Sequence, residues 1–429
     1  MRTIAAVVLL GALFLPALPG LPASPALFAQ VPFEQATRDL TNPDTERRLR
    51  AVRMLKAAAY PEAAIPLAGL VTDPEDAVQY EAIAAELNIF LAEKVVPRKR
   101  VALLVEVRHK IGAEAAFSGG PFVLNGVPVP IELLAALARS SRDDNPRVAL
   151  EALYALGALA GDAPADARRE LLRVIGPELA GILGVPELEL RVAAARVIGR
   201  VFARGRQDPP VDEEVGDAVI LALNDRQRDV RLAAMDALGD MRYERSVQAL
   251  TDLYQYYRHN EIGGGALQAL SRIGHASSAP LFQEQVNGRS AVARIAAIGG
   301  LARAGDPGGA GEIRRALARE RDERVLLAEG FSNALVGGGP LDPFFEALAK
   351  PKLRDQAMRY LLELAPERAA AFTRRAQDGV ARLRADVADV LGVSRDPAAL
   401  AIVESMAGDA DPIAARAAAR ASARLRRAQ

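Results

Sequence analysis

The stretch that decides the fold is DRQRDVRLAAMDALG, residues 225–239. It opens with an aspartate, continues through Val230-Arg231, and then repeats small apolar residues every three or four positions. That spacing predicts a helix with one apolar face, on which alanines let a neighbouring helix approach closely. We expect Asp225 to cap this helix at its N-terminus and Gly239 to end it in a left-handed conformation.

Degraded copies of this stretch recur along most of the chain. Each copy leaves room for a preceding first helix, as residues 215–224 precede residues 225–239. From the first half of the chain onward, the apolar marker equivalent to Val230 returns about every thirty residues, which is the period of a helical repeat. The markers are Val192, Val230, Ile262, Val292, Val325, Leu353, Leu383 and Ile413. Paired amphipathic helices at this period predict a helical solenoid.

The recurring Asp-Pro, Val-Arg, Ala-Ala and Leu-Gly pairs resemble the HEAT-like repeat, in particular the short form linked to phycobilisome lyases. The resemblance covers most of residues 40–426. It implies a right-handed superhelix and a role in protein interaction or scaffolding. The predicted fold is therefore all-α, an α-solenoid of about ten or eleven HEAT-like two-helix repeats with one irregular, hairpin-containing insertion.

The repeat pattern is interrupted between Pro97 and Pro130. An apolar helix is expected over residues 101–117, and residues 122–130 predict a short extended hairpin about an Asn-Gly turn. The insertion either lies on a binding face or fills a discontinuity between repeats. The expected organisation is a signal peptide at 1–29, N-terminal repeats at 30–96, the insertion at 97–130, and the main array with a C-terminal capping helix at 131–429.

The N-terminus has the pattern of a secretory signal peptide. Met1-Arg2 supplies positive charge, residues 4–18 are apolar, and small residues follow, with cleavage expected near Ala26 or Ala29. This pattern predicts export to the periplasm or the extracellular space. The alternative is an uncleaved membrane anchor, which the prolines between residues 16 and 25 disfavour because they interrupt a continuous helix.

Composition limits the function classes. Lys plus Arg and Asp plus Glu each total 54, so the formal net charge is zero and no nucleic-acid partner is expected. The chain has no cysteine, which excludes disulfides, cysteine metal sites and a lipid-modified cysteine. Stability must therefore come from the packing of mainly aliphatic side chains.

Enzymatic motifs are weak or missing. None of His109, His259 and His275 is followed by glutamate, unlike the His-Glu pairs of iron-binding HEAT-repeat hydroxylases. Ser332 lies in Gly-Phe-Ser-Asn-Ala, which fails the Gly-x-Ser-x-Gly pattern at its last position. We expect no catalytic residue, no metal and no cofactor. A bilin-lyase activity is an alternative that the resemblance alone implies.

Two surface features are candidates for contact with a partner. Residues 253–260 hold the densest aromatic cluster of an aromatic-poor chain, and Tyr with Arg is favoured at interfaces, although these tyrosines can also fill space between repeats. The arginines between residues 416 and 427 predict a solvated final cap or, alternatively, a surface that attracts anions. The predicted partner-binding residues are Tyr254, Tyr256, Tyr257, Arg258 and His259 of the cluster, with Phe122 and Asn125 of the insertion.

These features predict a non-catalytic scaffold of the cell envelope that binds a protein or peptide along its superhelical surface. Membrane contact is expected only if the N-terminal segment stays uncleaved. The alternatives are a membrane-tethered structural module and an enzyme whose site has no recognisable motif.

Overall fold

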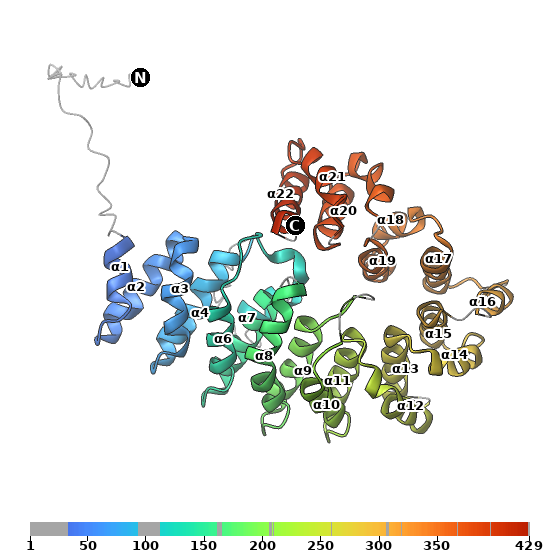
Figure 1. Ribbon diagram of the computed structural model, residues 1–429, viewed down its shortest axis with the longest axis horizontal. Helices are drawn as coiled ribbons and strands as arrows, with labels where there is room; N and C mark the ends of the chain where they lie inside the picture. Colours follow the sequence, from blue (N-terminus) through green and yellow to red (C-terminus); the bar gives the residue numbers. More distant parts are fainter. Residues whose placement is uncertain are drawn as a thin grey trace, which may run out of the picture.

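The computed structural model describes residues 33–92, 112–160, 165–205, 208, 210–258, 260–305, 309–318, 320–366, 368–394 and 396–427. Over these residues the chain forms 22 α-helices and no strand, with one isolated antiparallel bridge between Leu91 and Leu124. Figure 1 shows two layers of helices along a curved superhelix whose C-terminal end returns toward its first third. The predicted all-α solenoid is confirmed. The signal segment and most of the helix expected over residues 101–117 lie outside the described residues.

The inner layer lines the inside of the curve, and each of its helices packs against the next along the chain. Its members are α2 (Thr45–Ala58), α4 (Asp76–Phe90), α7 (Pro146–Ala160), α9 (Leu188–Val201), α11 (Arg228–Asp240), α13 (Glu261–Ile273), α15 (Ala291–Ala304), α17 (Glu323–Gly337), α19 (Pro351–Leu364), α20 (Ala381–Val393) and α22 (Pro412–Arg427).

The outer layer supplies the first element of each repeat. Its helices are α1 (Phe33–Asp39), α3 (Ala64–Ala68), α6 (Ile131–Ser140), α8 (Ala165–Ile182), α10 (Glu213–Ala222), α12 (Val247–Tyr256), α14 (Ala279–Gln285), α16 (Gly309–Leu317), α18 (Asp342–Leu348) and α21 (Ala399–Ser405). Before α20 this element is reduced to two 3-10 turns, η6 (Ala369–Phe372) and η7 (Arg375–Gln377). The described part of the chain thus holds eleven repeats, as the period predicts. None of its helices is both long and apolar enough to cross a membrane.

Small residues let the inner helices approach closely. A Cβ atom added at Gly199 of α9 would lie 2.8 Å from the Cα atom of Ala237 on α11, a distance that side-chain carbons do not tolerate. Val230, Ala234 and Leu238 of α11 are fully buried in the same layer. The alanine-rich composition therefore serves a tightly stacked inner layer.

An arginine in the first turn of many inner helices connects neighbouring repeats. Arg191 of α9 donates from Nη1 to the carbonyl oxygens of Val185 and Pro186, at 2.9 and 2.8 Å. Its Nε and Nη2 atoms donate to Asp225, which lies between the two helices of the next repeat, with a shortest distance of 2.8 Å. We call the set of such contacts the arginine ladder. Its ion pairs are Arg48–Asp73, Arg191–Asp225, Arg294–Glu320, Arg354–Asp386 and Arg384–Asp409, at 2.6 to 2.8 Å.

Two predictions about residues 225–239 are wrong in detail. The N-cap of α11 is Gln227, and Asp225 lies ahead of it in the turn, where it accepts from the Gln227 amide at 2.7 Å and from Arg191. The helix continues through Gly239 to Asp240, and the left-handed residue after it is Arg242. Gly239 has a packing role instead, because a Cβ atom there would lie 2.5 Å from Nε of Arg272.

The insertion contributes one extra helix, α5 (Gly112–Ser118), and a 3-10 turn, η3 (Gly120–Val123). The predicted hairpin over residues 122–130 is wrong. Instead of pairing with itself, this segment runs beside the end of α4: Asn125 donates from its backbone amide to the Phe90 carbonyl at 2.8 Å. Its backbone groups find partners on a neighbouring helix end, so a second strand is not needed.

α5 is held against the inner layer through both of its ends. At its start, the Ala113 amide donates to the Glu151 carboxylate of α7 at 2.9 Å. Burial raises the pKa of Glu151 to about 7, and the hydrogen bond from the Ala113 amide acts in the opposite direction. At its end, Arg200 of α9 donates to the Phe117 carbonyl at 3.1 Å and lies 4.5 Å from the centre of its ring. The insertion therefore covers the inside of α7 and α9.

The insertion also meets the last helix of the chain, about three hundred residues away, as Figure 1 shows. Arg424 of α22 is buried and donates to the carbonyl oxygen of Pro121. Gly126 has a φ of 91°, and a Cβ atom added to it would lie 2.6 Å from Cβ of Ala423. We call this contact the closing contact. The C-terminal arginines are thus not simply a solvated cap, because Arg424 joins the last helix to the insertion.

We predict that replacing Arg191 by Met lowers the free energy of unfolding by about 2 to 3 kcal/mol, because two carbonyls and the nearly buried Asp225 lose their partner. The measurement is urea unfolding followed by far-UV circular dichroism. Arg226→Met is the control, since Arg226 is exposed, and a change within about 0.5 kcal/mol is expected there. Equal losses in the two variants would contradict the ladder's role.

We predict that Gly126→Ala opens the superhelix, which small-angle X-ray scattering would detect as a larger radius of gyration. Gly120→Ala is a matched control because Gly120 also has a positive φ, 77°, but has open space around it. Both variants carry a backbone cost of about 1 kcal/mol, whereas only Gly126→Ala clashes with α22. If the two variants scatter alike, the closing contact does not set the shape.

Candidate functional site

Charged side chains gather on the inside of the curve, toward the ends of the inner helices. They stand six and ten residues after the apolar residue in the first turn, as Asp236 and Asp240 follow Val230. With the adjoining Arg242 they form what we call the inner strip, spread over α9, α11, α13, α15 and α19. Its members are Arg196, Arg200, Asp236, Asp240, Arg242, Arg272, Arg303, Arg359 and Glu363. The strip therefore holds six arginines and three carboxylates.

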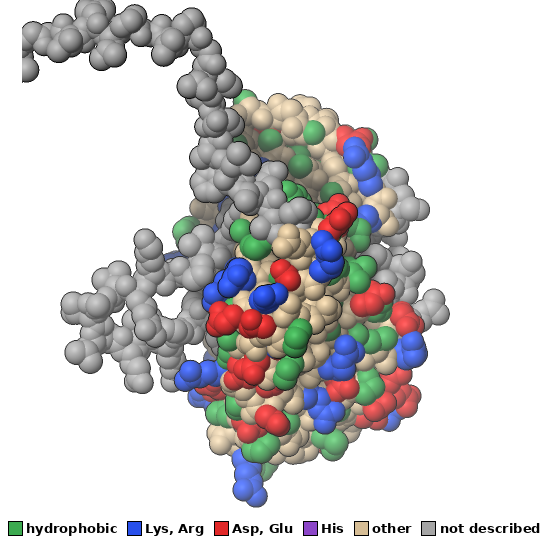
Figure 2. Space-filling view, turned by 90° about the vertical axis from the view of Figure 1, so that its left-hand side faces the viewer, with side chains coloured by type: hydrophobic (Ala, Val, Ile, Leu, Met, Phe, Trp, Pro, Cys, Tyr) green, Lys and Arg blue, Asp and Glu red, His purple; other side chains and the backbone are tan. Residues whose placement is uncertain are grey.

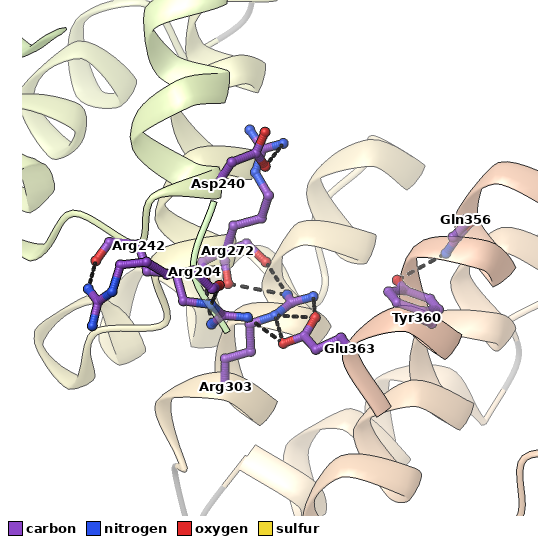
Figure 3. A network of polar contacts seen from close by, with 9 residues as sticks. Arg204, Asp240, Arg242, Arg272, Arg303, Gln356, Tyr360 and Glu363 are labelled. Atoms are coloured by element: carbon purple, nitrogen blue, oxygen red, sulfur yellow. Dashed lines mark hydrogen bonds and ion pairs between the residues drawn. The ribbon is translucent and has the colours of Figure 1, made fainter. Parts of the chain in front are cut away.

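Glu363 of α19 joins arginines from two earlier repeats, as Figure 3 shows. Arg242 donates to it at 2.7 Å, and Arg303 donates from Nε and Nη2 with a shortest distance of 2.7 Å. Burial by itself would raise the pKa of Glu363, but the Arg303 and Arg242 guanidiniums hold it at about 2. Because Arg242 and Glu363 are 121 residues apart, this contact crosses the inside of the curve.

Arg303 is fixed in place by more than its ion pair. It donates from Nη1 to the Ser271 carbonyl at 3.2 Å, and its guanidinium lies 4.7 Å from the centre of the Phe331 ring. Phe331 in turn stacks on Tyr360 with ring centres 4.2 Å apart. A guanidinium held this way loses little conformational freedom when it binds a further group.

Asp240 is the last residue of α11 and lies within electrostatic range of arginines on α9, α13 and α19. Arg272 pairs with Asp240 at 3.2 Å and with Asp236 at 2.6 Å. Desolvation by the surrounding protein raises the pKa of Asp240, although part of its side chain is exposed to solvent. The positive charges of Arg272, Arg200 and Arg359 lower this pKa. Arg200 and Arg359 are thus within electrostatic reach of one carboxylate, although they come from distant repeats.

The predicted aromatic cluster lies on the outer layer, at the end of α12. Tyr254 is buried beneath Arg258, whose guanidinium is 5.8 Å from the ring centre and pairs with Glu284 of α14 at 2.7 Å. Tyr256 is 81% exposed and meets Tyr257 edge to face, with ring centres 4.6 Å apart. Tyr254 therefore fills space between repeats, and Tyr256 is the member free to contact a partner. His259 lies outside the described residues.

The two predicted residues of the insertion lie near the closing contact, on a different part of the molecule from α12 (Figure 1). Asn125 donates from Nδ2 to the Ile89 carbonyl at 2.7 Å and accepts from the Val127 amide at 2.9 Å. These two hydrogen bonds of the Asn125 side chain hold the loop against α4. Phe122 lies in η3 and is half-buried.

A polar depression opens between the second and third repeats. It has a volume of about 540 Å³ and is lined by Thr72, Asp73, Pro74, Asp76, Gln79, Asp143, Asp144 and Asn145. Asp73 is bound by Arg48, Asp76 by Asn145, and Asp143 by Gln79. These carboxylates serve the packing of neighbouring repeats. Ser332 is buried within α17, and no metal-binding group of three His, Asp or Glu side chains occurs in the part of the chain that the structure describes.

Elsewhere the charges are mixed. Figure 2 shows acidic and basic side chains interspersed over the described surface near the N-terminal repeats. The inner strip escaped prediction because its members are dispersed over more than 160 residues of sequence. The available signal was the position within the repeat: a charged residue stands ten positions after the apolar residue of the first turn in α9, α11, α13, α15 and α19, and a search for local motifs does not detect this spacing.

Part of the chain matches a known family of helical repeats. A family model described as HEAT repeats matches residues 216–298, and no curated protein matches the chain. An engineered protein of known structure is similar with a TM-score of 0.43 and 16% identity, over 92% of this chain and 98% of its own. A designed armadillo repeat protein in complex with the peptide (KR)4 has a TM-score of 0.39 and 19% identity, over 56% of this chain and 99% of its own.

The unit that the family model matches over residues 216–298 is the same two-helix unit that recurs along the described chain. This is a HEAT-like repeat protein. Its fold is typical of protein-interaction scaffolds, which present an extended surface instead of a catalytic cavity.

We predict that Glu363→Gln lowers the free energy of unfolding by about 3 kcal/mol at neutral pH, because Arg242 and Arg303 lose a nearly buried counter-charge. The depressed pKa means that this stability is present above the ordinary glutamate pKa and is lost as pH falls from about 4.5 to about 2. Urea unfolding measured across this pH range should show that the free energy of unfolding falls less with decreasing pH in the variant than in the parent protein. Glu404→Gln, at an exposed ion pair, should stay within about 0.5 kcal/mol of the parent.

Proposed function

We propose that this protein is an exported, non-catalytic scaffold of the cell envelope that binds a protein or peptide along its superhelical surface. The observation that carries the proposal is the inner strip, a set of charged side chains contributed by five inner helices. A partner lying along the curve contacts several repeats at once, and the stacked helices keep these contacts in a fixed arrangement.

Export rests on the N-terminal pattern of a positive start, an apolar stretch and small residues near Ala26 and Ala29. The absence of cysteine suits an oxidising compartment, because no thiol is available for unwanted pairing. In such a compartment the arginine ladder and the aliphatic core supply the connections that disulfides give to other exported proteins.

The proposal predicts that the protein recovered from the cells that make it lies in the envelope or medium and begins after Ala26 or Ala29. Cell fractionation and mass spectrometry of the mature N-terminus measure both. A chain in the cytoplasm that retains Met1 would refute export. A membrane-bound chain that retains Met1 would favour the membrane-tethered module.

Binding is tested by placing a photo-crosslinking amino acid at single positions of the exported protein. Asp236 is an inner-strip position, 62% exposed, and Tyr256 is the accessible member of the aromatic cluster. Position Arg315, exposed on the outer helix α16, is the control. We expect a discrete protein adduct from the Asp236 position. Adducts no stronger than the control at both test positions would refute a scaffold that binds on these faces.

A further inference from the structure

We propose that the inner strip binds an acidic, extended segment of the partner protein, with Arg200 and Arg359 as the principal carboxylate-binding residues. The inference rests on the proposed scaffold function and adds the chemistry of what is bound. Four observations lead to it: an excess of arginine, two guanidiniums that form no ion pair, the fixed orientation of Arg200 and Arg303, and the lack of exposed apolar side chains at the strip positions.

The strip has more positive than negative charge. It contains six arginines and three carboxylates, and one carboxylate from outside the strip, Glu114 of α5, lies 3.9 Å from Arg196. Two positive charges therefore remain when these groups are counted together. The whole chain has equal numbers of acidic and basic residues, so the excess is a local property of the inner face.

Two arginines of the strip make no ion pair. Arg200 donates to the Phe117 carbonyl and lies over its ring, and Asp240 acts on its charge without forming an ion pair with it. Arg359 is exposed on α19, with neither a hydrogen bond nor an ion pair among the described residues. Other arginines of the strip bind carboxylates: Arg242 and Arg303 share Glu363, and Arg272 pairs with Asp236 and Asp240.

The geometry favours a carboxylate that binds without rearrangement. The Phe117 ring and carbonyl fix Arg200, while the Phe331 ring and the Ser271 carbonyl fix Arg303. A guanidinium already oriented by protein contacts binds a carboxylate with a smaller loss of freedom than a mobile lysine would.

The same surface disfavours an apolar partner. The large apolar side chains exposed on the described surface include Leu221 and Tyr256 of the outer layer and Val292 at the start of an inner helix, and none occupies a strip position. A segment that binds in the strip must therefore be recognised mainly through charge and hydrogen bonds. An extended chain suits it, because about three residues of a strand span the distance of about 9 Å between neighbouring helices.

The test measures binding of fluorescein-labelled peptides to the full chain by fluorescence anisotropy at low and at physiological salt. A peptide of alternating Glu and Gly is compared with one of alternating Lys and Gly. We expect the acidic peptide to bind, the basic peptide not to bind, and the affinity to fall as salt rises. Binding of the basic peptide, or of neither, would overturn the inference.

Three substitutions locate the binding. Arg359→Glu is expected to weaken binding of the acidic peptide about tenfold, since it replaces an attraction by a repulsion. Asp240→Asn should strengthen it severalfold. Arg315→Glu changes the net charge equally but lies on the outer helix α16, and it should leave the affinity unchanged. Equal weakening by Arg359→Glu and Arg315→Glu would show a nonspecific charge effect and reject the site.

Two further outcomes separate this inference from the proposed function. Tighter binding of a single-stranded oligonucleotide than of the acidic peptide, weakened by Arg359→Glu, would assign the strip to a nucleic acid and overturn the peptide. If photo-crosslinking identifies a partner protein whose binding is unaffected by Arg359→Glu, the scaffold function stands and the acidic-segment inference falls. Circular dichroism of each variant confirms that the fold is retained.

Discussion

The interaction on which the rest of the structure depends is the arginine ladder. One guanidinium satisfies the carbonyl oxygens of the turn before its own helix and holds a carboxylate of the next repeat. Arg191 and Asp225 show the complete arrangement. Turn carbonyls and a carboxylate near the interior would each be costly without a partner, and a single side chain satisfies them together. Because the planar guanidinium fixes directions as well as distances, the contact also sets how one repeat is rotated against the next. The curvature of the whole array follows from many such small, repeated rotations.

Curvature then creates contacts that no single repeat contains. Side chains on the inside of the curve come close enough for Glu363 to bind Arg242 across several repeats. At the far end, α22 meets the insertion through Arg424 and the small residues Gly126 and Ala423. A solenoid usually gains stability only between neighbouring repeats. Here two sets of long-range contacts are added, so the C-terminal end of the array is linked to the insertion and the inner face is held at a fixed curvature.

Arginine has three roles in this molecule, and position within the repeat separates them. In the first turn it connects repeats, at the end of the inner helix it lines the inside of the curve, and in α22 it joins the C-terminus to the insertion. The first and third roles satisfy backbone carbonyls and nearby carboxylates. In the second role Arg200 and Arg359 form no ion pair, and the proposed binding of an acidic segment rests on this difference.

The sequence by itself determined the helical class, the period and the number of repeats. These follow from local spacing, since an apolar residue every three or four positions and small residues between helices are properties of one repeat. It also indicated that Val230-Arg231 is a recurring unit, though not what Arg231 and its equivalents bind. Only the tertiary structure decided that residues 122–130 lie against α4 without forming a hairpin, that Tyr254 is core, and that Asp236, Arg272 and Glu363 belong to one surface. The physical reason is that these outcomes depend on the angle between successive repeats. Small rotations add up over eleven repeats, and their total cannot be predicted from a local sequence pattern.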